Sequence, residues 1–147
     1  MNGFLYIPYW RAGSYQKLTY RTQLYIAPLC QNPVTLAVYL YENGGRPWAG
    51  KVFAIEIDQQ TGEVRTDQNG MFQVNMNPNQ VVRIEINVLD SEYGTGEVHL
   101  VGGENQIAVL ARGECEVFAT KPSGEFEITI SEITITGAEP TILERGR

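Results

Sequence analysis

The chain has 147 residues, of which 43% are hydrophobic, and its formal net charge at pH 7 is −6. This length suits one domain with its own buried core, and the hydrophobic content excludes a disordered chain. The acidic balance argues against nucleic acid as the main partner, because nucleic-acid-binding proteins usually present a broad basic surface.

Residues 1–41 differ from the rest of the chain in charge and in aromatic content. They contain no Asp or Glu but hold seven of the eight tyrosines, and their three basic residues give the segment a charge of +3. Because Tyr, Trp and Arg are the residues that anchor protein interfaces, we expect a docking segment here. The predicted partner-binding residues are Phe4, Tyr6, Tyr9, Trp10, Arg11, Tyr15, Lys17, Tyr20, Arg21 and Tyr25.

The first predicted elements are two extended segments. Pro8 interrupts the first, which favours an edge strand or an isolated extended segment because proline removes a ladder hydrogen bond. The second, residues 17–26, alternates well, and Pro28 and Pro33 then bracket a linker. We therefore predict an extended N-terminal arm with its linker over residues 1–33. Packing of these tyrosines in the chain's own core is the competing interpretation.

From residue 34 onward, period-2 alternation dominates, which is typical of strands with one buried face. The clearest case places Val82, Ile84 and Ile86 on one face, and no stretch of twelve residues has a helical period. Turn-forming Gly, Asn and Pro residues separate the runs. The sequence therefore predicts an all-β fold, an antiparallel immunoglobulin-like β-sandwich over residues 34–137, with a tail over residues 138–147. The other runs lie at residues 34–41, 51–58, 71–75, 96–101, 105–111, 115–119, 125–130 and 132–136.

Near the C-terminus the predicted inward phase changes between residues 130 and 133. A bulge, or a strand that changes sheets, would reconcile the two phases. The residues predicted to point inward are Phe126, Ile128 and Ile130 before the change, and Ile133 and Ile135 after it.

Two short stretches carry a resemblance to a known group of folds. Gly45-Arg46-Pro47-Trp48-Ala49-Gly50-Lys51-Val52 is followed by Thr66-Asp67-Gln68-Asn69-Gly70-Met71-Phe72-Gln73-Val74. This order resembles the carboxypeptidase regulatory-like and transthyretin-like group of immunoglobulin-like sandwiches. The resemblance covers under half of the chain and implies an accessory, adhesive or scaffolding module, although a fold by itself does not establish an activity. The turn residues that it implies are Pro47, Gly50, Asp67 and Gly70.

Few residues suggest chemistry. Asp67 and Asn69 could begin a calcium loop, but the further acids of such a loop are missing, and both residues commonly stabilise turns. His99 is the only histidine; one His cannot build a typical zinc site, and we expect it to point outward from a strand. A nucleophilic pair between His99 and Cys30 or Cys115 has no local signature to support it.

The remaining polar residues are interpreted structurally. The two cysteines are predicted to be free thiols, because the N-terminus lacks the pattern of a signal peptide and disulfides are rare in chains that stay in a cytoplasm. Four glutamates alternate on two neighbouring predicted strands and are expected on the solvent face of a hairpin. We predict no catalytic residue, no metal and no cofactor. The four glutamates are Glu114, Glu116, Glu125 and Glu127.

The sequence thus favours a non-enzymatic structural or assembly protein, a decoration, cement or tail component of a tailed-phage virion, made in the host cytoplasm and docking to other protein subunits through its N-terminal arm. Nucleic acid and membrane are not expected as partners, since no apolar run is long enough to span a bilayer. The main alternative is a carbohydrate- or cell-surface-binding module in which Trp10 and Trp48 help to form a platform. A third is the accessory domain of a hydrolase.

Overall fold

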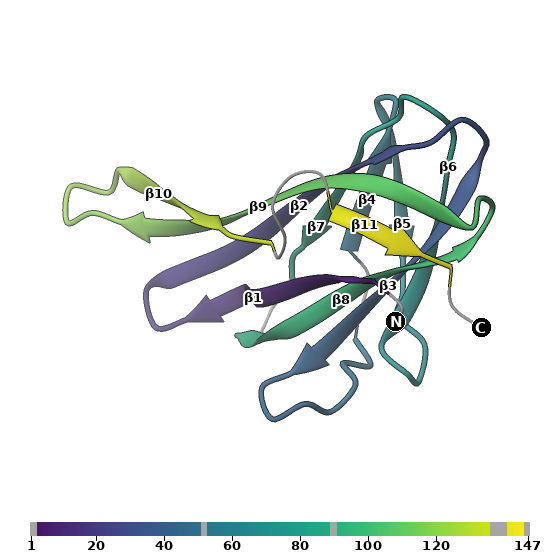
Figure 1. Ribbon diagram of the computed structural model, residues 1–147. Coiled ribbons are helices and arrows are strands. Elements are labelled where there is room, and N and C mark those ends of the chain that lie inside the picture. The colour runs from purple at the N-terminus through teal and green to yellow at the C-terminus, as the bar shows by residue number, and fades with distance from the viewer. Residues whose placement is uncertain (1–2, 51–52, 89–90, 136–140, 146–147) are drawn as a thin grey trace.

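The computed structural model describes residues 3–50, 53–88, 91–135 and 141–145. Within these residues the protein is all-β, without a helix, and its antiparallel sheet nearly closes into a barrel (Figure 1). The prediction of an all-β, antiparallel fold is therefore confirmed. The strands are β1 (Leu5–Tyr15), β2 (Leu18–Leu29), β3 (Val34–Glu42), β4 (Phe53–Ile57), β5 (Gln60–Val64), β6 (Met71–Met76), β7 (Val82–Ile86), β8 (Glu92–Gly102), β9 (Gln106–Thr120), β10 (Phe126–Ile133) and β11 (Thr141–Glu144).

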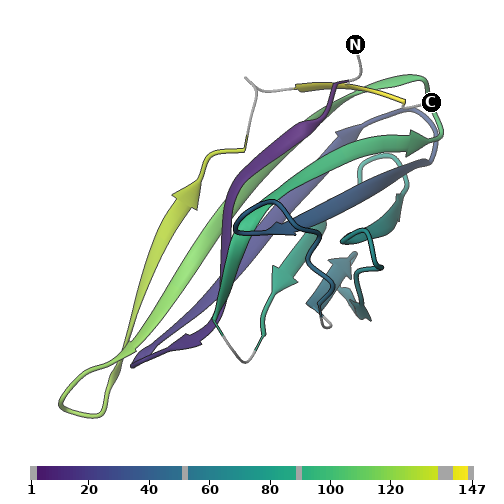
Figure 2. The same ribbon diagram turned by 90° about the horizontal axis from the view of Figure 1, so that it is seen from below.

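The sheet consists of two halves that enclose the core (Figure 2). The β8 half is formed by β1, β8, β3 and β6, and the β2 half by β5, β4, β7, β2 and β9, with β10 and β11 both paired to β9. Strand β1 joins the halves, because it pairs first with β8 and then, at Gly13–Tyr15, with β2. An isolated parallel bridge between Leu100 and Arg145 brings the end of β11 next to β8. Two contacts between the halves thus account for the near closure.

The period-2 pattern of the sequence corresponds directly to the buried face of the sheet. Val82, Ile84 and Ile86 of β7 are fully buried, while Arg83 and Glu85 between them are partly exposed. In β3 the predicted inward residues are all buried in the same core cluster. Burial of a large aliphatic side chain contributes about 1.5–3 kcal/mol, so this alternation fixes which face of each strand points inward. The inward residues of β3 are Val34, Leu36, Val38 and Leu40.

A separate N-terminal arm is not confirmed, because residues 5–29 form two strands inside the sheet. Strand β2 pairs with β9 over its whole length, and its other edge is shared by β1 and β7. Pro8 lies where the register between β1 and β8 shifts, so it disturbs no regular ladder. Pro28 is buried within β2 and does not end the strand. The buried core side chains of the two strands are Leu5, Ile7, Trp10, Ala12, Leu24 and Ile26.

The expected inward phase of β10 is wrong for Ile128 and Ile130, which are 55% and 60% exposed. The register between β9 and β10 runs without a bulge, and it places Ile128 opposite Phe118 and Ile130 opposite Glu116 on the outer face. The β9–β10 hairpin also extends beyond the rest of the sheet, so no facing strand covers its far end (Figure 1). Ile133 and Ile135 are buried, as predicted.

The Asp67–Gly70 segment forms a tight turn. One carboxylate oxygen of Asp67 accepts hydrogen bonds from the backbone N–H groups of Asn69 and Met71, at 2.8 and 3.0 Å. Gly70 has a φ of 74°, and a Cβ there would collide with the carbonyl oxygen of Leu40, so both its conformation and its surroundings require glycine. One oxygen of Asp67 thus holds the turn by accepting two backbone hydrogen bonds, in agreement with the structural interpretation.

The other two turn residues lie beside Trp48. The hydroxyl of Thr66 donates to the carbonyl oxygen of Trp48 at 2.7 Å and accepts the N–H of Gly50 at 2.9 Å. A side chain at Gly50 would overlap the Trp48 ring, and Pro47 forms an isolated bridge with Tyr41. This part of the chain is therefore held as a structural unit around the buried indole. Lys51 and Val52, which belong to the same motif, lie outside the described residues.

Candidate functional site

The outer surface of the β8 half carries a cluster of aromatic rings, which we call the aromatic face. It arises because the inward positions of β3 and β8 are aliphatic or glycine and those of β1 are aliphatic apart from Trp10 and Gly13, so the alternate positions point outward. The register places Tyr6, Glu97 and Tyr39 side by side across three strands, although they lie far apart in the sequence. The aromatic face consists of Phe4, Tyr6, Tyr39, Tyr41, Tyr93 and His99.

Contacts between the rings hold several of these side chains in place. Phe4 stacks on His99 with 5.0 Å between ring centroids, and Tyr39 meets the edge of the same imidazole at 5.2 Å. Tyr39 and Tyr41 are nearly parallel, with centroids 6.4 Å apart, and a nitrogen of His99 lies 2.8 Å from a carboxylate oxygen of Glu97. Paired rings of this kind lose little further freedom when a partner binds.

The aromatic face is accessible and carries little charge. Phe4 and Tyr6 are each 41% exposed, and Tyr93 is 46% exposed. Burial, with a smaller contribution from the charge of Glu97, raises the pKa of Tyr41, so this phenol stays neutral at physiological pH. Exposed, uncharged rings can bury apolar area and offer hydroxyl groups for hydrogen bonds.

Arg11 is held by aromatic residues of its own chain. Its guanidinium carbon lies 3.9 Å from the ring centroid of Tyr20 and 5.8 Å from that of Tyr93. Its backbone N–H and carbonyl both bond to the hydroxyl of Thr22, at 2.9 and 2.7 Å. Burial raises the pKa of Tyr9, and a hydrogen bond with Arg11 partly opposes this effect. The ring of Tyr20 is thus packed against Arg11 of its own chain.

The outer face of the β2 half carries ion pairs instead. Arg83 lies 2.9 Å from Glu56 and 3.1 Å from Glu85, and Arg21 lies 2.8 Å from Glu116 and 3.7 Å from Glu85. Hydrogen bonding to Glu56 is the main reason that the pKa of Arg83 is raised. Because its charge is matched inside the chain, Arg21 is poorly suited to attract a partner's acidic surface.

The structure does not bring the ten predicted docking residues together. Phe4 and Tyr6 lie on the aromatic face, whereas Tyr15 and Lys17 lie at the β1–β2 turn. Arg21 and Tyr25 belong to the ion-paired surface, where the Arg112 guanidinium carbon lies 5.0 Å from the Tyr25 ring centroid. Tyr9, Arg11 and Tyr20 lie between these regions, and Trp10 is buried.

The prediction that Trp10 is a docking residue is wrong, because this side chain is buried. Its side chain is 0% exposed, its indole N–H donates to the carbonyl oxygen of Thr95 at 2.9 Å, and its ring meets the edge of Trp48 at 5.3 Å. Trp48 is buried as well. Neither tryptophan can serve as the exposed sugar platform considered from the sequence, because both indoles fill the core.

Four residues of the aromatic face were missing from the predicted site. Tyr39 and Tyr41 could have been included, because they alternate with inward Val38 and Leu40 in the sequence. Tyr93 and His99 gave no such signal. They join the site only because β8 pairs with both β1 and β3, and this long-range pairing is not encoded in any local pattern.

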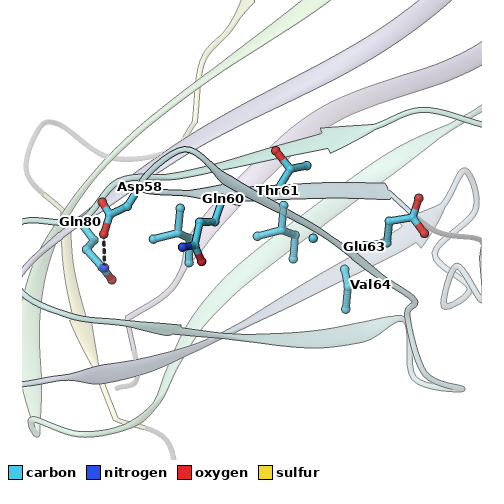
Figure 3. Close-up of a pocket in the computed structure, with 9 residues that line it drawn as sticks. Asp58, Gln60, Thr61, Glu63, Val64 and Gln80 are labelled. Carbon is cyan, nitrogen blue, oxygen red and sulfur yellow. Dashed lines mark hydrogen bonds between the residues drawn. The ribbon is translucent and has the colours of Figure 1, made fainter.

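A hollow at the β4–β5 hairpin has a volume of about 550 Å³ and is shown in Figure 3. Ile55, Ile57 and Val64 supply its apolar lining, and Asp58 accepts a hydrogen bond from the Gln80 amide at 2.7 Å. It opens widely to solvent and contains neither His nor Cys. The hollow therefore offers no nucleophile of the Cys or His type.

In the part of the chain that the structure describes, no three His, Cys, Asp or Glu side chains gather so that they could hold a metal ion. The described ranges also contain no helix that could cross a membrane. Of the four alternating glutamates, Glu114 and Glu116 pair with Arg112 and Arg21 on the outer face. Glu125 and Glu127 are exposed.

Both cysteines are free, and their places in the fold keep them apart. Cys115 lies opposite Thr22 of β2, whereas Cys30 follows Leu29 at the far end of that strand. Eight residues of extended strand separate these positions, or about 26 Å at about 3.3 Å per residue. A disulfide requires Cα atoms within about 7 Å, so the two thiols cannot pair in the folded protein.

We expect Cys115 to be the less reactive thiol. It is buried, and burial is the main cause that raises its pKa, so its thiolate fraction near pH 8 is smaller than that of an ordinary cysteine. In the native Cys30→Ser variant, Ellman's reagent should react slowly with Cys115, and the reaction rate should keep increasing to a more alkaline pH than for an ordinary thiol. In the unfolded variant the same thiol should react fast. The Cys115→Ser variant, which retains the more accessible Cys30, is the matched control. Reaction of native Cys115 at the rate of a free thiol would contradict the expectation.

Comparisons of the chain with protein-family models, with curated proteins and with solved structures gave no match. The resemblance to the carboxypeptidase regulatory-like group thus stays a prediction from two short motifs. The function has to be argued from the surfaces described above.

Proposed function

We propose that this protein is a non-enzymatic structural or assembly protein that binds a partner protein through its aromatic face. The observation that supports this most strongly is that the exposed rings of Phe4, Tyr6 and Tyr93 lie on one face with half-buried aromatic rings that contact one another. The half-buried rings are those of Tyr39, Tyr41 and His99. Contiguous exposed apolar surface on a soluble domain commonly marks an interaction site. Tyr is also among the residues that contribute most to binding energy in protein interfaces.

The contrast between the two outer surfaces supports the same assignment. On the β2 half, Arg21 and Arg83 find their acidic partners within the chain, so that surface gains little by binding another charged surface. The aromatic face has no comparable ladder of ion pairs among its described residues. Among the described residues of this face, an ion pair joins Glu97 to His99, which is charged only when the imidazole is protonated. Desolvation of this face on binding is therefore the less costly of the two.

The setting we propose is a viral particle, in which the protein serves as a decoration, cement or tail component of a tailed phage. The fold we propose is the immunoglobulin-like class suggested by the motifs around Pro47 and Asp67. Both parts of the proposal rest on the sequence. The docking mode differs from the one predicted there, because the N-terminal strands would contribute a sheet face instead of a free arm.

Site-specific photo-crosslinking in cells that produce the protein tests the docking proposal. A photoreactive phenylalanine analogue in place of Tyr6 or Tyr93 should give a defined adduct with one partner protein. The same analogue at Gln23, on the ion-paired surface, is the matched control and should give none. The triple variant Phe4→Ser, Tyr6→Ser, Tyr93→Ser should remain folded and should no longer associate with the captured partner. Equal adducts from both surfaces, or none from either, would contradict the proposal.

A carbohydrate-binding module remains the alternative, favoured by the nearly parallel rings of Tyr39 and Tyr41. A flat pair of rings can stack on a sugar through its apolar face. Saturable binding on a glycan array, lost in the Tyr39→Ala, Tyr41→Ala double variant, would support this alternative. Trp10→Ala and Trp48→Ala are unsuitable for this purpose, because both side chains are part of the core.

A further inference from the structure

Strand β10 is an edge strand of the protruding β9–β10 hairpin. It pairs with β9 over eight consecutive residues, and no described strand pairs with its other edge. An unpaired strand edge is a template for another strand, and proteins commonly protect such edges with lysine, proline or a bulge. Strand β10 has none of the three, and its two acids, Glu127 and Glu132, stand on either side of an uncharged centre.

The uncharged centre of β10 presents bare aliphatic side chains. Ile128 and Ile130 point to the same outer face and are the most exposed isoleucines among the described residues. They lie opposite Phe118 and Glu116 of β9. The guanidinium carbon of Arg21 in turn lies 5.0 Å from the Phe118 ring centroid. Nothing in the described part of the chain folds back over the two isoleucines. Covering them with another strand would remove apolar area from water.

We propose that two copies of this chain associate through their β10 strands, which pair antiparallel about a two-fold axis at Thr129. The sequence around Thr129 reads the same in both directions at its centre, Ile-Thr-Ile. In this register each Ile128 lies opposite the partner's Ile130, and the two Thr129 residues face each other. β-Branched cross-strand pairs of this kind favour sheet pairing.

The charges of β10 fit the same register. With Thr129 on the axis, Glu127 lies opposite Ser131 of the other copy, and no glutamate opposes a glutamate. If Ile130 were on the axis instead, Ile128 would lie opposite Glu132, which loses the isoleucine pairs. A two-fold axis perpendicular to the sheet also keeps both outer faces on one side, so the four isoleucines form one patch. A second copy of the chain is thus an occupant that fits this edge in both shape and charge.

The proposed contact is independent of the aromatic face, which lies on β1, β3 and β8. An experiment that disproves the β10 dimer therefore leaves the proposed role of the aromatic face untouched, and the reverse also holds. Because each copy carries a net charge of −6, association should become tighter as salt screens the repulsion between copies.

Light scattering coupled to size-exclusion chromatography, run over a range of concentrations, tests the dimer. The native chain should shift from 16.5 kDa toward twice that mass as concentration increases. The Ile128→Glu, Ile130→Glu double variant should stay monomeric, as should the Ile128→Lys, Ile130→Lys variant. Mixing the two should restore a dimer, because lysine then lies opposite glutamate. The control is Ile142→Glu, an isoleucine of β11 that is 46% exposed, which should leave dimerisation unchanged.

Disulfide trapping tests the register. In a Cys30→Ser, Cys115→Ser background, which also removes the native thiol opposite Ser131 in β9, Thr129→Cys should form a covalent dimer on mild oxidation, because the two residues face each other across the axis. Ser131→Cys alone should not link, since its two copies would lie about 13 Å apart at about 3.3 Å per residue. A mixture of Glu127→Cys and Ser131→Cys chains should link. A native chain that is monomeric at every concentration would overturn the dimer, and self-linking of Ser131→Cys without Thr129→Cys would overturn the register.

Discussion

Deletion of residues 2–30 is expected to leave a chain that does not fold. The deletion removes β1 and β2, which supply core side chains and the strand against which β7 and β9 pair. Without β2, the neighbouring strands would expose both an apolar face and unpaired backbone groups, each of which is costly. Loss of cooperative thermal unfolding and of dispersed amide signals in a proton NMR spectrum would show the effect.

This expectation reverses the one that the sequence suggested. A detachable arm would leave a folded, monomeric sandwich that no longer assembles. A truncated chain that retains a cooperative unfolding transition would therefore contradict the structure and favour the arm. The double variant Tyr15→Ala, Lys17→Ala is a control from the same segment. Both residues lie at the exposed β1–β2 turn, so this variant should unfold cooperatively like the parent.

Trp10→Ala is expected to lower the free energy of unfolding by about 3–5 kcal/mol, the range typical for truncation of a large buried aromatic residue. The substitution leaves a cavity next to Trp48 and removes the hydrogen bond to the carbonyl oxygen of Thr95. Urea unfolding followed by far-UV circular dichroism measures the change.

Tyr15→Ala is the matched control for this substitution. Tyr15 also belongs to β1, but it is 56% exposed, so its removal should change the free energy of unfolding by about 0.5 kcal/mol or less. Similar effects of the two substitutions would mean that Trp10 is not a core residue.

The sequence predicted the all-β, antiparallel character of the fold, because the alternation of apolar and polar residues matches the buried and exposed faces of strands such as β7. The inward face of β7 was identified from its period-2 pattern, and β3 and β6 bury alternate residues in the same way. Two predicted runs, residues 105–111 and 115–119, are instead one long strand. β9 passes through Gly113 unbroken because β2 provides it with a continuous partner over the same length.

The N-terminal segment could not be interpreted correctly from local patterns. Pro8 and Pro28 are strand-breaking signals, yet one lies at a register shift and the other remains within a paired strand. The phase of β10 failed for a related reason. Ile128 and Ile130 alternate like core residues, but the register of β10 with β9 places them opposite Phe118 and Glu116 on the outer face of the sheet.

The candidate site was predicted only in part. Aromatic composition drew attention to Phe4 and Tyr6, which lie on the exposed aromatic face, but it also selected the buried Trp10. Composition does not distinguish an aromatic residue on the inner face of a strand from one on the outer face. The grouping of Tyr6, Tyr39 and His99 depends on which strands become neighbours, and that information is distributed over the whole chain.

The pairing of β2 with β9 also affects how the chain folds as it is synthesised. Arg21 and its ion-pair partner Glu116 lie 95 positions apart, and β1 likewise pairs with β8, whose first residue is Glu92. The ribosome therefore has to release most of the chain before the N-terminal strands find their neighbours. Until then, a tyrosine-rich segment with an apolar face stays without its main partners. Sheets closed by such distant pairings form slowly. The first thirty residues of a nascent chain are thus exposed to aggregation until these later strands have been made.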